Sequence, residues 1–159
     1  MSDFIYDSLG TVVAWGLAHH GGHPRSKQAQ LTDVEYLTGT NNAFAAKKRD
    51  GTVITWGSAE DGGDPGTKQS QLTDVESITS TGGAFAAKKR DGTVVTWGKA
   101  GAGGDPGSKQ SQLTDVESIA STCSAFAAKK RDGTVVTWGR ADRGGDPGSK
   151  QSKLVDIIL

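Results

Sequence analysis

One stretch of fifteen residues decides the fold: Ala84-Phe-Ala-Ala-Lys-Lys-Arg-Asp-Gly-Thr-Val-Val-Thr-Trp-Gly98. It recurs unchanged over 125–139 and, with isoleucine in place of one valine, over 43–57, while an eroded fourth copy ends at Trp15-Gly16. A fixed period of this size is the signature of a repeat architecture, in which each unit packs against its neighbours. We therefore expect a single repeat domain over 1–159, with a partial unit at 139–159. Its tryptophans lie 41 residues apart, at Trp15, Trp56, Trp97 and Trp138.

Composition narrows the class of protein. Hydrophobic residues make up 34% of the chain, but they gather in short periodic segments, which argues against disorder. Eighteen basic and eighteen acidic residues cancel, so no global field favours nucleic acid or an anionic membrane. The lone Cys123 excludes an internal disulfide framework, and no segment resembles a signal peptide or a membrane helix. We expect a cytoplasmic protein.

Each unit carries two tight-turn signals. Gly82-Gly83 and Asp91-Gly92 are pairs that suit two-residue hairpin turns, because both central residues need positive φ. Two-residue turns predict a three-stranded antiparallel meander in which Trp97 faces Ala86 and Lys89 has Glu76 opposite. The same register pairs Glu35 with Lys48 and Glu117 with Lys130.

Both faces of each meander carry apolar groups, so we expect each sheet to be sandwiched between two others. The Lys-Gln-Ser-Gln-Leu part of each linker could add a short fourth strand. Meanders that repeat every forty-odd residues and are buried on both faces predict an all-β, propeller-like array of four blades.

The two ends of the chain would complete one blade between them. The segment 155–159 aligns with the first strand of a meander, and Phe4–Trp15 aligns with its second and third strands. This pairing could occur within one closed four-bladed chain or between two chains. We favour pairing between two chains, and we expect a closed ring in either case. An open filament is the further alternative.

The pattern Asp-Gly-Thr-Val-Val-Thr-Trp-Gly, followed by a Gly-rich turn and a Val-x-x-Ile strand, resembles the repeat of the regulator of chromosome condensation superfamily. The resemblance covers almost the whole chain and implies a β-propeller. The chain departs from the family pattern after the tryptophan, where the usual Gly-Gln-Leu-Gly is replaced by Gly-Gly-Asp-Pro-Gly, and it holds fewer repeats than the seven that the family implies. Exchange-factor activity on a small GTPase is therefore not transferred to any residue of this chain.

Three sets of residues are candidate sites, each with an ordinary structural alternative. The basic triplets could form a rim that binds acidic groups, or they could be solvated hairpin ends. The aspartates of the Gly-rich loops could bind Ca²⁺ or sugar hydroxyls, or they could only shape turns. A histidine cluster in the first loop could bind Zn²⁺ or Ni²⁺, although drift at the end of an array is the favoured explanation. The triplets are Lys47, Lys48 and Arg49; Lys88, Lys89 and Arg90; and Lys129, Lys130 and Arg131; the aspartates are Asp61, Asp64, Asp105, Asp142 and Asp146; and the histidines are His19, His20 and His23.

No catalytic constellation is evident, because a repeat offers each residue several times whereas catalysis needs one unique set. The sequence therefore predicts a non-enzymatic interaction module without a cofactor, whose partner is a protein or a glycan and not a specific nucleic acid or a membrane. The alternatives are a lectin-like protein that uses the repeated Gly-Gly-Asp-Pro-Gly loops, and a strand-exchanged structural assembly. Differences between the copies are confined mainly to the Gly-rich loops and the two ends, so function is expected there.

Overall fold

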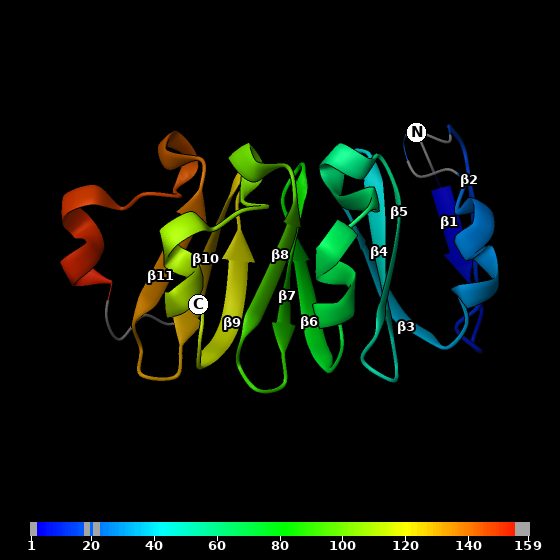
Figure 1. The fold of residues 1–159 in the computed structure, drawn as a ribbon, viewed down its shortest axis with the longest axis horizontal. Helices are drawn as coiled ribbons and strands as arrows, with labels where there is room; N and C mark the ends of the chain where they lie inside the picture. Colours follow the sequence, from blue (N-terminus) through cyan, green and yellow to red (C-terminus); the bar gives the residue numbers. More distant parts are fainter. Residues whose placement is uncertain (1–2, 18–19, 21–22, 155–159) are drawn as a thin grey trace.

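The computed structural model describes residues 3–17, 20 and 23–154, and within them eleven strands form four antiparallel sheets that stand side by side in a row (Figure 1). We call these sheets blades 1 to 4. No helix among the described residues has both the length and the apolar character needed to cross a membrane. Blade 1 contains β1 (Asp3–Tyr6) and β2 (Val12–Trp15); blade 2 contains β3 (Val34–Gly39), β4 (Ala43–Lys48) and β5 (Val53–Gly57); blade 3 contains β6 (Val75–Ser80), β7 (Ala84–Lys89) and β8 (Val94–Gly98); blade 4 contains β9 (Val116–Ser121), β10 (Ala125–Lys130) and β11 (Val135–Gly139).

The meander prediction is confirmed, but the register of its second hairpin is shifted by one residue. Trp97 lies opposite Phe85, not opposite Ala86. The turn between β7 and β8 has three loop residues instead of two: Gly92 donates to the carbonyl of Lys89, and its φ of 84° places it in the left-handed region. This is a type I turn followed by a glycine bulge, which Asp-Gly serves as well as a two-residue turn. The shift puts the two largest rings of the unit in contact, with centroids 5.2 Å apart.

A bulge in the first strand corrects a second expectation. The pairing of β6 with β7 shifts between Val75 and Ser77, so Glu76 reaches Lys88 and not Lys89. The same change gives Glu35 to Lys47 and Glu117 to Lys129.

The predicted fourth strand is wrong, since the linkers form short 3-10 helices. Each helix begins directly after a proline, which lies in Asp-Pro-Gly in three of the linkers and in His23-Pro-Arg25 in the first. A leucine follows each helix: Leu31, Leu72 and Leu113 are buried, and Leu154 is half-buried. A glutamine in each helix donates to the first carbonyl of the preceding outer strand, as Gln69 does to Val53 at 3.1 Å. The helix thereby covers part of the sheet edge that a fourth strand would have paired. The four helices are η2 (Arg25–Gln30), η4 (Gly66–Gln71), η6 (Gly107–Gln112) and η8 (Gly148–Lys153).

Every internal blade is buried on both faces, as the sequence predicted. Phe85, Val95 and Trp97 pack with residues of blade 2, whereas Ala84 and Ala86 pack with residues of blade 4. Each blade thus presents one bulky face and one face of small residues, and the bulky face of one blade packs on the small-residue face of the previous one.

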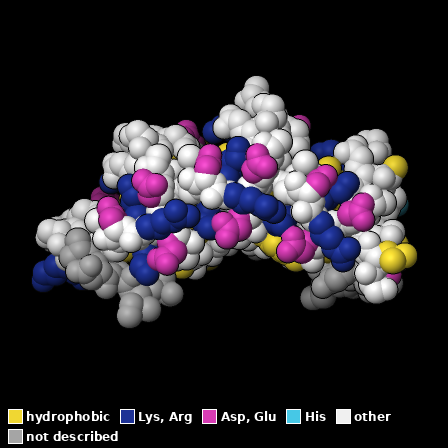
Figure 2. All heavy atoms as spheres, turned by 90° about the horizontal axis from the view of Figure 1, so that it is seen from below, with side chains coloured by type: hydrophobic (Ala, Val, Ile, Leu, Met, Phe, Trp, Pro, Cys, Tyr) yellow, Lys and Arg dark blue, Asp and Glu magenta, His cyan; other side chains and the backbone are white. Residues whose placement is uncertain are grey.

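The first strands of the blades lie closest together, and the row is curved into an arc (Figure 2). Their turns are joined by backbone hydrogen bonds, from Asn41 to the carbonyl of Gly82 and from Gly82 to that of Cys123. Blade 1 and blade 4 lie at opposite ends of the row, so the described residues form an open arc and not a closed four-bladed ring (Figure 1). The predicted pairing of residues 155–159 with blade 1 lies outside the described residues.

Candidate interaction site

A groove runs along the upper edge of blades 2 to 4 in the view of Figure 1, and we call it the upper groove. Its floor is formed by the turns between the first and second strands of each blade, and its walls are formed by the loops that follow the third strands. The volume is about 700 Å³. The floor turns are Asn41-Asn42, Gly82-Gly83 and Cys123-Ser124, and the loops contribute Glu60, Asp61, Lys99, Gly101, Ala102 and Arg140.

The three loops have similar backbones but carry different side chains. The first contains a π-helical turn, η3 (Ala59–Gly63), and the other two contain 3-10 turns, η5 (Ala100–Ala102) and η7 (Ala141–Arg143). The three loops have the sequences Ser58-Ala-Glu-Asp-Gly62, Lys99-Ala-Gly-Ala-Gly103 and Arg140-Ala-Asp-Arg-Gly144, with alanine second and glycine fifth in each. The glycines have nearly the same φ, between 97° and 101°, and the first two fit against the aromatic rings of the next blade. The fifth position of the loop is therefore held in the same conformation, while the exposed groups differ from blade to blade. The walls of the upper groove are thus formed by segments whose sequence differs between the repeats.

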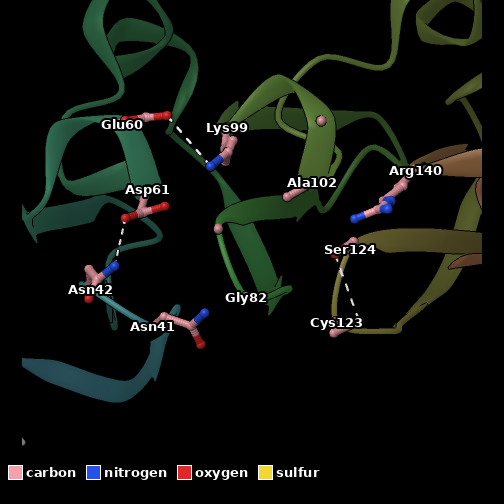
Figure 3. Close-up of a pocket in the computed structure, with 12 residues that line it drawn as sticks. Asn41, Asn42, Glu60, Asp61, Gly82, Lys99, Ala102, Cys123, Ser124 and Arg140 are labelled. Atoms are coloured by element: carbon pink, nitrogen blue, oxygen red, sulfur yellow. Dashed lines mark hydrogen bonds and ion pairs between the residues drawn. The ribbon is translucent and has the colours of Figure 1, made fainter.

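The groove has an acidic end and a basic end (Figure 3). Blade 2 contributes Glu60 and Asp61, and blade 3 contributes Lys99. Blade 4 contributes Arg140, which occupies the same loop position as Lys99 and is paired with Asp142. Lys99 Nζ lies 3.7 Å from Glu60 Oε1, with both side chains exposed, so the pair is weak and open to exchange for a ligand group. Asp61 Oδ2 accepts a hydrogen bond of 2.9 Å from the Asn42 amide, which fixes that carboxylate at the edge of the groove.

The described residues of the groove include several polar groups that can bind a ligand. Cys123 is exposed, and none of the described residues that line the groove is a histidine. The nearest polar neighbours of the Cys123 sulfur are Ser124 Oγ at 3.7 Å and Arg143 Nη1 at 4.0 Å. These groups can donate and accept hydrogen bonds along an extended ligand.

The basic triplets lie away from the upper groove, on the face shown in Figure 2, and only part of each triplet is accessible. Lys47 is 3% exposed and Lys88 is 7% exposed, because their stems pack inside the sheets while their ammonium groups reach Glu35 and Glu76. Those hydrogen bonds lower the pKa of each glutamate carboxyl. Sequence reasoning missed this burial, because lysine in a hairpin is normally read as solvated. The second lysines, Lys48, Lys89 and Lys130, are half-buried, Lys129 is half-buried and bonded to Glu117 at 2.9 Å, and Arg49, Arg90 and Arg131 are exposed.

Acidic side chains interrupt the basic groups on this face, as the interspersed colours of Figure 2 show. Each exposed arginine precedes an aspartate whose carboxylate is bonded to the turn; Asp91 Oδ1 accepts from both the amide and the hydroxyl of Thr93. These hydrogen bonds lower the pKa of the Asp91 carboxyl. The face is therefore one of alternating charge and not a continuous basic rim.

The loop aspartates divide into two groups. Asp64, Asp105 and Asp146 each accept a hydrogen bond of 2.8 to 2.9 Å from the amide two residues later, which shapes the start of a 3-10 helix. Asp61 lies in the upper groove, and Asp142 binds the Arg140 guanidinium through both oxygens, at 2.7 and 3.2 Å.

The histidines are only partly described. The His20 ring is hydrogen-bonded to the Asn42 side chain, His23 is exposed, and His19 lies outside the described residues. Among the residues that the structure describes, no three potential metal ligands come together.

The protein is thus a β-propeller-type repeat array whose variable loops form the walls of one asymmetric groove. Comparison with models of known families finds no match, and comparison with curated proteins finds none. Solved structures do match. A crystal structure of Kap60 bound to yeast RCC1 (Prp20) matches with a TM-score of 0.66 and 14% identity, over 89% of this chain and 42% of that one. Another of Prp20p from Saccharomyces cerevisiae matches with a TM-score of 0.61 and 14% identity, over 89% and 44%.

Human WBSCR16 matches with a TM-score of 0.62 and 18% identity, over 89% of this chain and 46% of that one. The chain has the RCC1-like β-propeller fold that its repeat resembles. It spans less than half the length of each of these three structures.

Proposed function

We propose that the chain is a non-enzymatic interaction module whose upper groove binds an extended segment of a partner protein. The observation that carries the proposal is that a single groove across blades 2 to 4 is lined by loop residues that differ between the full repeats: Glu60 and Asp61 in blade 2, Lys99, Gly101 and Ala102 in blade 3, and Arg140 in blade 4. Identical residues suffice to build and stack the blades. Different residues along this edge make its two ends chemically distinct, so an extended peptide can bind there in one orientation.

The chemistry of the groove favours a polar peptide over a small apolar ligand. Small-molecule sites are mostly enclosed and apolar. The upper groove instead presents amide, carboxylate and ammonium groups along an open edge, and it has no large apolar side chain among the lining residues that the structure describes. We infer a segment that carries a basic residue near Glu60 and Asp61 and an acidic residue near Lys99 and Arg140.

The structural relatives are consistent with protein binding by this fold. Yeast RCC1 (Prp20) has been crystallised with Kap60, and binding of Prp20p to Gsp1p and histones has been studied. The carbohydrate alternative depends on Asp64, Asp105 and Asp146. In each of these residues one carboxylate oxygen already accepts a hydrogen bond from the backbone of its own turn. None of the three lines the upper groove.

The test is selection of random twelve-residue peptides displayed on phage against the whole chain, followed by affinity measurement with the selected peptides. Lys99→Glu combined with Arg140→Glu should weaken binding at least tenfold, which is about 1.4 kcal/mol. The matched control combines Arg90→Glu with Arg131→Glu, which makes the same charge change on the same two blades but on the opposite face. It should alter affinity less than about twofold.

Equal losses in the two double variants would contradict the assignment of the groove, as would the absence of any peptide that binds more tightly than about 100 μM. A glycan array provides the second arm. Glycan binding that disappears when Asp64, Asp105 and Asp146 are changed to alanine would favour the carbohydrate alternative.

A further inference from the structure

The interface between blades repeats one contact. The Trp97 indole of blade 3 donates a hydrogen bond of 3.0 Å to the carbonyl of Gly62 in the loop of blade 2. Trp138 of blade 4 donates in the same way to Gly103 of blade 3, at 3.1 Å. Both indoles are buried, and both stack on a phenylalanine of their own blade. A tryptophan on the bulky face and a loop glycine on the small-residue face are thus the two halves of the contact.

The first end of the array exposes the tryptophan half. Trp15 occupies the same repeat position as Trp97, yet its side chain is 45% exposed and has no hydrogen-bond partner among the described residues. Val13 and Leu17 are exposed beside it, whereas Val95, the equivalent of Val13 in blade 3, is buried. Large exposed apolar side chains that adjoin one another mark a contact surface.

The other end exposes the glycine half. Gly144 has a φ of 101°, like its equivalents, but a Cβ built on it would approach nothing closer than 4.0 Å. A Cβ on Gly62 would lie 2.5 Å from the Phe85 ring. Beside Gly144 is an apolar hollow of about 110 Å³ that includes Ala125 and Ala127. Ala127 is half-buried, although its equivalents in blades 2 and 3 are fully buried.

We propose that these two ends bind each other between two copies of the chain, and that two such contacts close a two-chain ring. The bulky end of one chain, with Val13, Trp15 and Leu17, packs on the Gly144 end of its partner, and the Trp15 indole donates to the Gly144 carbonyl. A second copy is the occupant that fits, because each chain carries both halves of an interface that it already builds internally. Such a head-to-tail contact leaves one free end of each kind until the ring closes, and the curvature of the arc favours closure (Figure 2).

The test is sedimentation equilibrium of the full chain over a concentration series. We expect a mass of twice 16.5 kDa at micromolar concentration and a reversible shift to one chain on dilution. Trp15→Ala should raise the dissociation constant at least a hundredfold. Leu9→Ala is the matched control: Leu9 is 73% exposed but lies in the turn between β1 and β2, so its loss should leave the dissociation constant within about twofold.

A second variant tests the Gly144 end of the proposed interface. Ala127→Arg places a charge on a face that one free chain leaves in solvent, so the variant should fold, with a circular dichroism spectrum like that of the original chain, and should sediment as one chain. Sedimentation of the original chain as one chain up to about 100 μM would overturn the proposal. So would a two-chain mass that survives both Trp15→Ala and Ala127→Arg, and so would open-ended growth instead of a closed pair.

Discussion

Removal of the Trp97 side chain tests the packing between blades most severely. The indole is 3% exposed, stacks on Phe85 at 5.2 Å and donates to the Gly62 carbonyl at 3.0 Å. Replacement of a buried tryptophan by alanine typically costs about 3 to 5 kcal/mol, and a buried carbonyl left without a donor adds about 1 kcal/mol or more. We expect Trp97→Ala to lose about 4 to 6 kcal/mol of unfolding free energy. This is a large share of the roughly 5 to 15 kcal/mol that stabilises an ordinary domain.

The assay is urea unfolding followed by far-ultraviolet circular dichroism, with thermal unfolding as a second measure. For a chain of this length, each kcal/mol shifts the melting temperature by about 2 to 4 °C, so Trp97→Ala should melt at least about 8 °C below the original chain. Trp97→Phe retains most of the apolar volume and should lose about 1 to 3 kcal/mol. Leu9→Ala, which removes an equally apolar but exposed side chain, should change stability by less than about 0.5 kcal/mol. If Trp97→Ala unfolds at the same urea concentration and temperature as the original chain, the Trp97 indole does not stabilise the packing between blades as we infer.

Three further predictions concern stability. Because Lys88 lowers the pKa of the Glu76 carboxyl from its ordinary 4.5, the stability from this pair should be complete above about pH 4.5 and fade as the pH falls below it; Glu76→Gln should flatten that dependence in thermal unfolding from pH 7 to 3. Glu76→Gln should also cost more than Glu117→Gln at pH 7, because Lys88 is the more buried of the two lysines; equal costs would argue against a role for burial. In the monomeric protein, Gly103→Ala should be more destabilising than Gly144→Ala. Both glycines have φ near 100°, but only a Cβ on Gly103 would meet an aromatic ring, that of Phe126 at 2.6 Å. Equal melting temperatures of the two variants would contradict this prediction.

The blade architecture could be predicted because the period is long, nearly exact and marked by tryptophan. Turn type was harder, because Asp91-Gly92 suits both a two-residue turn and a three-residue loop with a glycine bulge. That one-residue difference moved Trp97 from Ala86 to Phe85. The bulge at Glu76 was invisible in the sequence, because nothing in its side chains distinguishes it from a regular strand. The Lys-Gln-Ser-Gln-Leu part of each linker was predicted to be a strand, because the spacing of its residues does not indicate the 3-10 turns that follow Asp-Pro-Gly.

The candidate site was partly predictable. The Gly-rich loops were expected to carry function, and they supply the walls of the upper groove. The sequence did not indicate that the floor comes from the turns at Asn41, Gly82 and Cys123, because their proximity depends on the backbone hydrogen bonds that join adjacent blades. Nor could it separate the buried Lys47 and Lys88 from their exposed neighbours, because only the register of the sheet decides which lysine points inward.

The claim at the centre of this account is that the variable edge of the repeats is the binding surface. Chemical-shift mapping of the ¹⁵N-labelled chain during titration with a selected peptide tests it most directly. We expect saturable chemical-shift changes at the amides of Asn42, Gly83 and Ser124, and small changes at the hairpin turns of Gly51, Gly92 and Gly133 on the opposite face. Shifts concentrated at those hairpin turns, with the groove amides unmoved, would contradict it.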